Sequence, residues 1–259
     1  MGVKCQGCQS GAELDFDFSM AFQPIYDVGA ERVWGYEALI RGMAGEGAHS
    51  ILSRVTPEQK YKFDQACRVK ALELASALFP RESALQLSIN FMPNAVYEPA
   101  ACLRATLDAA RKSDFPLRSI MFEFTENEQV VDTAHLQRII AEYRRQGFIT
   151  ALDDFGAGFA GLSLLADFQP DLLKIDMNLI RGVDTNAARI TIVAAIVTIA
   201  RQLGIMVLAE GIETEGEFEI LKAAGIRLFQ GYYFARPAFE ALPPITREVL
   251  SQHPATLVA

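Results

Sequence analysis

Two adjacent carboxylates, Asp153 and Asp154, stand between an apolar run and a loop that contains Gly156 and Gly158. The run, residues 148–152, has no polar face, which predicts a buried strand. Adjacent strand residues point to opposite faces, so we expect the backbone to bend at the two glycines. Two carboxylates this close repel in a dry pocket unless a cation is present, which indicates a divalent-metal site with one Asp bridging two ions. The alternative is that both residues cap the helix after the loop.

Polar residues also end the other predicted strands. Because the carboxyl ends of barrel strands meet on one face, we expect these side chains to converge. Left unpaired, this many charges around one cavity would be very costly, which argues against unrelated positions. Oxygen ligands without His or Cys indicate Mg²⁺ or Mn²⁺ rather than zinc. The residues at the other strand ends are Glu37, Asn90, Glu123, Lys174, Glu210 and Gln230.

Five or six oxygen ligands make two ions feasible, and two ions can clamp a phosphoryl group and activate a bridging water. Lys174, the one cation in the ring, would orient that water or offset phosphate charge, or else form a structural salt bridge with a neighbouring Asp. Arg41 could bind a phosphate in bidentate fashion, with a surface ion pair as the alternative. Glu213 is expected to accept backbone N–H bonds from the glycine loop, or else to act as a first-turn helix charge.

Strands and helices alternate along the chain and must position these residues. A five-residue turn, 27–31, joins the first two strands and predicts an antiparallel hairpin. The alternation predicts an α/β fold, a (β/α)8 TIM-like barrel with one antiparallel strand, with a doubly wound open sheet as the alternative. We expect strands at 20–26, 33–39, 85–89, 119–124, 148–152, 172–175, 205–209 and 227–229. We expect a first helix that has Thr56 as its N-cap, begins at Pro57 and runs to residue 79. Further helices are expected at 100–112, 135–146, 162–168, 187–203 and 215–224.

Length and composition indicate a single large domain. The 259 residues, 51% of them hydrophobic, divide into a flexible N-terminal arm (1–18), a barrel (19–245) and a C-terminal tail (246–259). The formal charge of −8 argues against nonspecific nucleic-acid binding. The longest apolar stretch, 190–200, is too short to span a membrane, and no signal-peptide pattern is visible, so we expect a cytoplasmic protein without membrane contact.

Cys5 and Cys8 have the spacing of half a zinc site or of a redox pair. No second pair of this spacing and no nearby His pair completes a zinc site. We therefore expect reduced thiols without a role in the N-terminal arm.

Several motifs occur in the order in which they stand in EAL-domain proteins, the phosphodiesterases of cyclic di-GMP. The resemblance covers residues 18 to 240, and it is carried by Gln23-Pro24-Ile25, Glu37-Ala38-Leu39 with Arg41, Ser88-Ile89-Asn90, Glu123 in Phe-Glu-Phe-Thr-Glu, Asp153-Asp154-Phe155-Gly156, Lys174-Ile175-Asp176, Glu210-Gly211-Ile212-Glu213 and Gln230-Gly231-Tyr232. The resemblance implies a barrel with one antiparallel strand. It also implies hydrolysis of cyclic di-GMP to linear pGpG. In this reaction two metal ions, Mg²⁺ or Mn²⁺, would activate the attacking water.

The resemblance also implies roles for individual residues. The implied metal ligands are Glu37, Asn90, Glu123, Asp153, Asp154 and Glu210. The implied catalytic residues are Lys174, Glu210, Glu213 and Asp154, with Lys174 on the catalytic water and Glu213 steadying the glycine loop. We assign substrate contacts to Gln23, Arg41, Asp176 and Gln230. A homodimer formed around the glycine loop is implied as well.

Two departures from the family pattern concern loops. The glycine loop reads Ala157-Gly158-Phe159-Ala160-Gly161, without two hydroxyl residues that are usual there, and Leu179 stands where Phe is usual. Neither change touches an implied metal ligand, so they bear on loop coupling and dimer regulation. The alternative function is a catalytically silent receptor of cyclic di-GMP or a protein-interaction module. A metal-dependent barrel enzyme with another substrate is the third interpretation.

Overall fold

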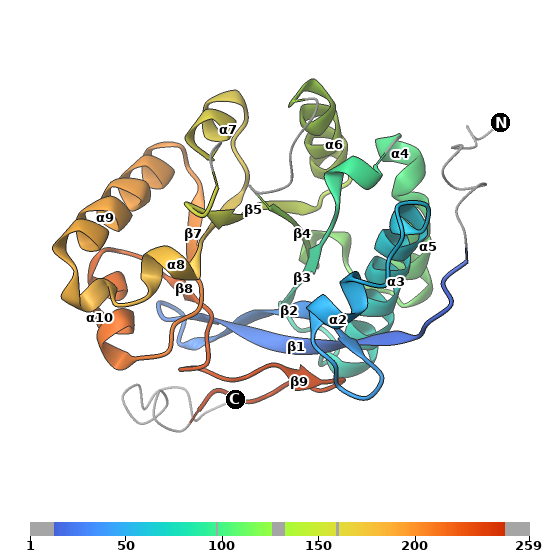
Figure 1. The fold of residues 1–259 in the computed structure, drawn as a ribbon, viewed down its shortest axis with the longest axis horizontal. Coiled ribbons are helices and arrows are strands. Elements are labelled where there is room, and N and C mark those ends of the chain that lie inside the picture. Colours follow the sequence, from blue (N-terminus) through green and yellow to red (C-terminus); the bar gives the residue numbers. More distant parts are fainter. Residues whose placement is uncertain (1–12, 97, 126–132, 159–160, 247–259) are drawn as a thin grey trace.

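A ring of strands forms the centre of the computed structural model, which describes residues 13–96, 98–125, 133–158 and 161–246 (Figure 1). In these ranges the strand order is β2-β3-β4-β5-β6-β7-β8-β1, and β1 pairs antiparallel with both β8 and β2, which closes the ring. The predicted barrel with one antiparallel strand is confirmed. The strands are β1 (Phe18–Asp27), β2 (Arg32–Gly42), β3 (Gln86–Asn90), β4 (Ile120–Thr125), β5 (Ile149–Phe155), β6 (Leu172–Ile175), β7 (Met206–Ala209) and β8 (Leu228–Phe229).

Helices surround the ring and explain why the inner strands are apolar on both faces (Figure 1). In β6, for example, every residue is buried, as expected for a parallel strand covered by helices outside and by side chains inside. The helices are α2 (Ala48–Leu52), α3 (Lys60–Leu78), α4 (Pro99–Cys102), α5 (Arg104–Lys112), α6 (Thr133–Arg145), α7 (Gly161–Asp167), α8 (Met177–Ile180), α9 (Ala187–Gln202) and α10 (Glu215–Ala223), with short 3-10 turns at Pro93–Ala95, Leu117–Ser119 and Val183–Thr185.

The amino ends of the parallel strands are closed by apolar side chains inside the barrel. This inner cluster leaves the charged residues to the opposite end, at the carboxyl ends of the same strands. Its members are Ile25, Met121, Ala151, Leu172, Leu208 and Leu228, with Trp34 and Ile149 packed against them.

Two helix predictions were wrong in detail. Thr56 does not cap α3: its N–H donates to Gln59 Oε1 at 3.1 Å in a preceding turn, and the helix begins at Lys60. The helix expected at 100–112 is two helices, α4 and α5, that meet at the fully buried Leu103. In both places local turn bonds or burial determine the boundary, which propensity alone does not encode.

Three short elements were not predicted: α2, α8 and a ninth strand, β9 (Ala238–Phe239). β9 pairs antiparallel with β1 at its outer edge, with Ala21 opposite Phe239. Each of the three has five residues or fewer, which is too short to show a hydrophobic period.

The described residues of the predicted N-terminal arm, 13–18, make contacts with the barrel. The Glu13 carbonyl accepts a bond from Gln59 Nε2 at 2.9 Å, the Phe16 ring lies 6.2 Å from that of Phe63, and Phe18 is buried in β1. Residues 13–18 therefore belong to the barrel. Residues 1–12, with Cys5 and Cys8, and residues 247–259 lie outside the described residues, so those parts of the domain prediction stay predictions.

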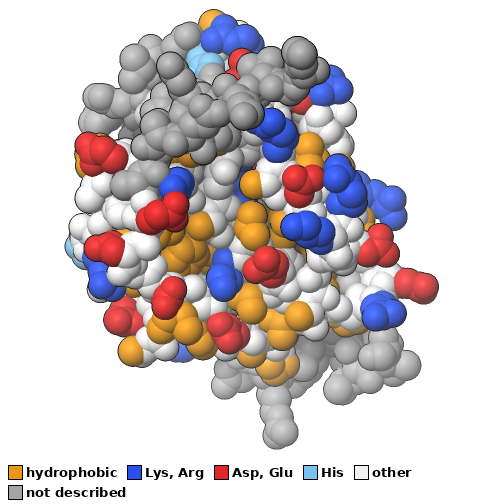
Figure 2. Space-filling model, turned by 90° about the vertical axis from the view of Figure 1, so that its right-hand side faces the viewer, with side chains coloured by type: hydrophobic (Ala, Val, Ile, Leu, Met, Phe, Trp, Pro, Cys, Tyr) orange, Lys and Arg blue, Asp and Glu red, His pale blue; other side chains and the backbone are white. Residues whose placement is uncertain are grey.

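The surface over α3 and α5 mixes both signs of charge with several groups of apolar side chains (Figure 2). On the described part of this face, basic side chains alternate with acidic ones, so the face offers no basic field to a polyanion. Of the helices described, none has both the length and the apolar character that crossing a membrane requires.

Candidate metal centre

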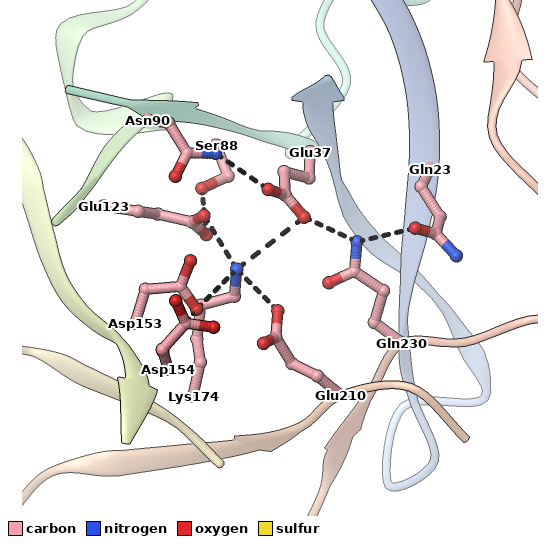
Figure 3. Close-up of polar contacts among 10 residues, drawn as sticks. All are labelled: Gln23, Glu37, Ser88, Asn90, Glu123, Asp153, Asp154, Lys174, Glu210 and Gln230. Carbon is pink, nitrogen blue, oxygen red and sulfur yellow. Dashed lines mark hydrogen bonds and ion pairs between the residues drawn. The ribbon is translucent and has the colours of Figure 1, made fainter. Parts of the chain in front are cut away.

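The side chains predicted to converge do so at the carboxyl ends of the strands (Figure 3). Glu37 lies in β2, Asn90 ends β3, Glu123 lies in β4 and Lys174 in β6. The remaining members of this metal-centre cluster are Asp153 and Asp154 from β5, Glu210 after β7 and Gln230 after β8. Each parallel strand thus supplies one residue to the same space, except β5, which supplies two.

Lys174 is the cation at the centre of the cluster, and its side chain is 1% exposed. Its Nζ lies 2.6 Å from Glu210 Oε1, 2.7 Å from Glu123 Oε2, 3.2 Å from Asp153 Oδ1 and 3.7 Å from Glu37 Oε2. The alternative of a simple salt bridge to one Asp does not describe this arrangement. One ammonium group cannot balance four carboxylates, so the cluster carries excess negative charge in a buried place.

Burial first, and then the neighbouring charges, shift the pKa values of the acids. Burial raises the pKa of Glu123 to about 8, although Lys174 acts in the opposite direction. Burial, and then the neighbouring Asp153, raise the pKa of Glu210 well above its ordinary value and that of Asp154 to about 6. Burial lowers the pKa of Lys174, but the surrounding carboxylates outweigh it and the net shift is upward. Additional positive charge in the cluster would favour the ionised acids.

Two amides hold Glu37 in place. Asn90 Nδ2 donates to Glu37 Oε1 at 2.9 Å, and Gln230 Nε2 donates to Glu37 Oε2 at 2.8 Å. The Ser88 hydroxyl similarly donates to Glu123 Oε1. Ser88 is a site residue outside the predicted set. It stands two residues before Asn90 in β3, so the alternation of side chains along a strand already places both on one side of the sheet.

The bend at the aspartate pair begins two residues before Gly156, the first of the two glycines, and Gly156 itself has φ +96°. Asp154 itself has φ +55°, in the left-handed region, and the β5–β6 register shifts between Leu152 and Phe155. The Asp154 N–H donates to Asp153 Oδ1 at 2.8 Å. This bulge turns two adjacent side chains toward one site. Both residues lie within β5, well before α7 begins, so the helix-cap alternative is wrong.

The donor set fits a divalent ion. Oxygen atoms of Asp153, Asp154 and Glu210 lie within 4.8 Å of one another, and excess negative charge surrounds them. Carboxylate oxygens without His or Cys suit a hard cation. The other predicted ligands, Glu37, Asn90 and Glu123, line the same space but already have partners within the protein. Glu37 accepts hydrogen bonds from Asn90 and Gln230. Glu123 accepts hydrogen bonds from Ser88 and Lys174.

A pocket of about 240 Å³ opens beside the cluster and contains three of the predicted substrate-binding residues, Gln23, Asp176 and Gln230. Gln23 Nε2 donates to the Ala235 carbonyl at 3.2 Å, and Asp176 caps α8 by accepting from the Asn178 N–H at 2.8 Å. Gln230 Oε1 is buried and accepts no bond in the described structure. It is an acceptor available for a donor on a bound molecule.

Arg41 and Glu213 are the predicted site residues that make other contacts. Arg41 Nη1 donates to the Ile40 carbonyl at 2.7 Å, and the described structure gives it no ion pair with the cluster. Glu213 lines the pocket, and its Oε1 lies 2.8 Å from Arg181 Nη2. Its expected bonds to the glycine loop remain a prediction, because residues 159–160 lie outside the described residues.

Comparisons with known proteins agree on one family. The model of the EAL domain matches residues 12–237. A solved structure titled a standalone versatile EAL protein from Vibrio cholerae O395, in a form with c-di-GMP bound, is 51% identical, with a TM-score of 0.88 over 92% of this chain and 99% of that one. Klebsiella pneumoniae BlrP1 in a manganese and cyclic di-GMP complex is 34% identical, with a TM-score of 0.81 over 89% of this chain and 58% of that one.

Curated relatives are longer than this chain. The blue light- and temperature-regulated antirepressor BluF of Escherichia coli is 31% identical over 87% of this chain and 55% of its own length. The cyclic di-GMP phosphodiesterase PA2567 of Pseudomonas aeruginosa is 29% identical over 85% of this chain and 38% of its own length. The chain thus spans about half or less of the length of these relatives.

Proposed function

Because this chain belongs to the EAL domain family, we propose that it is a metal-dependent phosphodiesterase that hydrolyses cyclic di-GMP to linear pGpG. The observation that carries the proposal is the buried cluster of four carboxylates around one lysine, whose excess negative charge suits divalent cations. The relative named as a phosphodiesterase and the complexes with cyclic di-GMP support the choice of substrate.

The chain's own oxygen atoms would hold two ions, Mg²⁺ or Mn²⁺. The ligands would come from Glu37, Asn90, Glu123, Asp153, Asp154 and Glu210. When bound, the ions supply an activated water and neutralise charge that develops on the phosphoryl group.

The remaining residues would position the substrate and the water. Lys174 keeps its proton in this cluster, so its Nζ can donate to the attacking water or to a phosphate oxygen. Asn90 and Gln230 hold Glu37 in one rotamer, which preorganises the metal centre. Gln230 Oε1 would accept from a base N–H.

Three further proposed roles use residues at the edges of the site. Gln23 and Asp176 line the same pocket and would contact the dinucleotide. Arg41 would reach a phosphate by leaving the Ile40 carbonyl. Glu213 would steady the glycine loop.

Incubation of the purified protein with cyclic di-GMP and Mn²⁺ or Mg²⁺, with pGpG followed by chromatography, tests the proposal. We expect pGpG to appear and to be lost on chelation. Glu37→Ala and Asp154→Asn should abolish hydrolysis, while Glu219→Ala, a substitution in the exposed Glu219–Lys222 pair on α10, should not. Near-normal turnover by Glu37→Ala would refute the metal-centre assignment.

The second candidate is a catalytically silent receptor of cyclic di-GMP or an interaction module. The relative named as an antirepressor and the two missing hydroxyls of the glycine loop favour it. Tight binding of cyclic di-GMP without pGpG in either metal would select this alternative.

We also propose that the protein forms the homodimer that the resemblance implies around the glycine loop, and that the outer side of α9 adds to its interface. This helix buries Val193, Ile196 and Ala200 against the barrel, yet its outer side is also apolar, and Ile192 is 48% exposed. Light scattering during size-exclusion chromatography measures the mass directly. A monomer at micromolar concentration would contradict the dimer and leave the hydrolysis proposal standing.

A further inference from the structure

The segment after β7, residues 210–214, carries Glu210 and has no regular structure of its own. Its start is tied to the barrel by backbone bonds: the Glu210 N–H donates to the Ile175 carbonyl at 3.2 Å, and the Ile212 N–H donates to the Gln230 carbonyl at 3.1 Å. Its other end is held by side chains. A change in those side chains would therefore act on Glu210 from a distance.

Glu217, in the first turn of α10, is the buried anchor of that other end, with its side chain 2% exposed. Its Oε2 accepts from the N–H groups of Glu213 at 3.0 Å and Thr214 at 3.3 Å, while Thr214 Oγ1 accepts from the Glu217 N–H, which completes a capping box. Its Oε1 accepts from the Gly182 N–H at 3.0 Å. One carboxylate thus joins the segment after β7 to the chain that follows α8.

Arg181 supplies the positive charge for this junction. Its guanidinium lies 2.8 Å from Glu213 Oε1 and 3.6 Å from Glu217 Oε1. Single exposed ion pairs contribute little, but here one guanidinium contacts two carboxylates, and one of these is buried and accepts three backbone bonds. Arg181 follows α8, which begins three residues after Lys174, so the junction connects both sides of the metal centre.

Close packing leaves this segment little freedom to compensate. Gly211 has φ +67°, and a Cβ there would lie 2.5 Å from Met177 Cβ in α8. A Cβ on Gly231 would lie 2.1 Å from the Ile212 carbonyl oxygen. The segment is thus enclosed by α8 on one side and by the chain after β8 on the other.

We propose that Arg181 and Glu217 are positioning residues that hold the segment after β7 and thereby set the place of Glu210 in the metal centre. In the described structure neither residue contacts the metal-centre cluster itself, and both act through Glu213 and the backbone. This inference rests on the proposed metal-dependent function.

Calorimetric titration of the purified full chain with Mn²⁺ alone tests the inference without any turnover. We expect Arg181→Gln to weaken Mn²⁺ binding about tenfold, in the range seen when groups behind metal ligands are removed. Arg181→Lys should recover part of the loss, because it restores a charge at the junction. Arg145→Gln, which removes a comparable exposed ion pair on α6, is the matched control and should bind Mn²⁺ like the wild type.

A double-mutant cycle separates the ion pair from general destabilisation. If Arg181 acts through Glu213, the two substitutions should not add. The double variant Arg181→Gln with Glu213→Gln should then bind Mn²⁺ no more weakly than the single variant that has the lower Mn²⁺ affinity. At saturating Mn²⁺ the hydrolysis rate of Arg181→Gln should approach the wild-type value.

Two outcomes would overturn the inference and are distinguishable. If the wild type binds Mn²⁺ and hydrolyses cyclic di-GMP while Arg181→Gln and Glu217→Gln bind Mn²⁺ equally well, the positioning role falls and the proposed function stands. If the wild type itself binds no divalent metal, both fall.

Discussion

Two buried cations, Lys174 and Arg68, show how differently one barrel can use internal charge. Arg68, in α3, is fully buried and pairs with the buried Asp64 one turn earlier. Its Nη1 donates to the Tyr143 hydroxyl at 2.9 Å, and its guanidinium lies 5.3 Å from the ring centroid of Phe122. Lys174 is buried to the same degree, but it faces four carboxylates and no aromatic ring in the described structure.

The difference lies in charge balance and not in burial. Around Arg68 one carboxylate, one hydroxyl and aromatic faces match a single positive charge, so the charge is balanced, although the buried Arg68 Nε has no hydrogen-bond partner in the described structure. Both oxygens of Asp64 have partners, because Oδ2 faces Arg68 and Oδ1 accepts from the Met92 N–H at 2.9 Å. Around Lys174 the negative charge exceeds the positive charge. A buried charge by itself therefore indicates structure, whereas an unbalanced set indicates a place for further cations.

Removal of the central cation should have the largest effect. We expect Lys174→Met to lower the hydrolysis rate by about 10³-fold, the scale seen when one preorganised donor is lost. In metal-free buffer this variant should also be less stable than the wild type, because four carboxylates then face one another without a cation. Mn²⁺ should raise its melting temperature more than that of the wild type.

The rate of pGpG formation and differential scanning calorimetry in EDTA and in Mn²⁺ measure these two effects. Equal melting temperatures of Lys174→Met and wild type in EDTA would contradict the charge imbalance on which the comparison depends.

Removal of the other cation should affect stability without affecting chemistry. Arg68→Met leaves Asp64 buried and unpaired, so we expect a loss of about 3–5 kcal/mol in the free energy of unfolding, measured by urea denaturation. The rate per folded molecule should remain near the wild-type value. The double variant Arg68→Met with Asp64→Asn is the control and should lose less. A selective loss of turnover in a stable Arg68→Met protein would place this pair in the catalytic machinery instead.

The imbalance also predicts a pH dependence for the metal-free protein. The pKa of Glu123 is about 8 in the folded state, against an ordinary value of 4.5, so between these values the folded state binds more protons than the unfolded chain. Stability should therefore fall as the pH rises from 5 to 8. Asp154, whose pKa is raised to about 6, acts in the same direction.

Urea denaturation in EDTA at several pH values measures this slope. Glu123→Gln should flatten it, and so should saturating Mn²⁺, which binds the ionised acids. A free energy of unfolding that rises between pH 5 and 8 in EDTA would argue that positive and negative charge in the metal-centre cluster are already balanced.

The smallest effect is expected for the cysteine pair outside the described residues. Cys5→Ser and Cys8→Ser, singly or together, should leave the hydrolysis rate unchanged, because the polar groups described in the metal centre come from other residues. Metal analysis of the purified protein is the accompanying measurement. Stoichiometric zinc, or a reduced rate in either variant, would show that the pair has a role of its own.

The sequence was sufficient to predict which residues come together in the metal-centre cluster. Glu37, Asn90, Glu123, Asp153 and Lys174 each lie in or directly after an apolar run, and parallel strands bring such ends to one face. The α/β alternation and the short 27–31 turn likewise predicted the barrel and its antiparallel strand. These features are local in sequence, so patterns of type and spacing contain them.

Side-chain contacts between residues far apart in the sequence could not be predicted from such local patterns. The Arg68–Asp64–Tyr143 cluster joins residues 75 positions apart, and the Arg181–Glu213 pair depends on how α8 lies beside the segment after β7. The left-handed Asp154 was missed because a non-glycine residue adopts φ +55° only where its surroundings hold it there.

Residue types and their spacing were enough to name the chemical groups that the barrel presents, because the hydrophobic period sets the strands and the residue after each strand supplies the group. The charge balance of these groups emerged only in the folded arrangement, in which four carboxylates share one lysine, two amides fix Glu37, and Gln230 Oε1 has no hydrogen-bond partner among the described residues. This balance depends on distances between side chains from different strands, and burial makes those distances matter most.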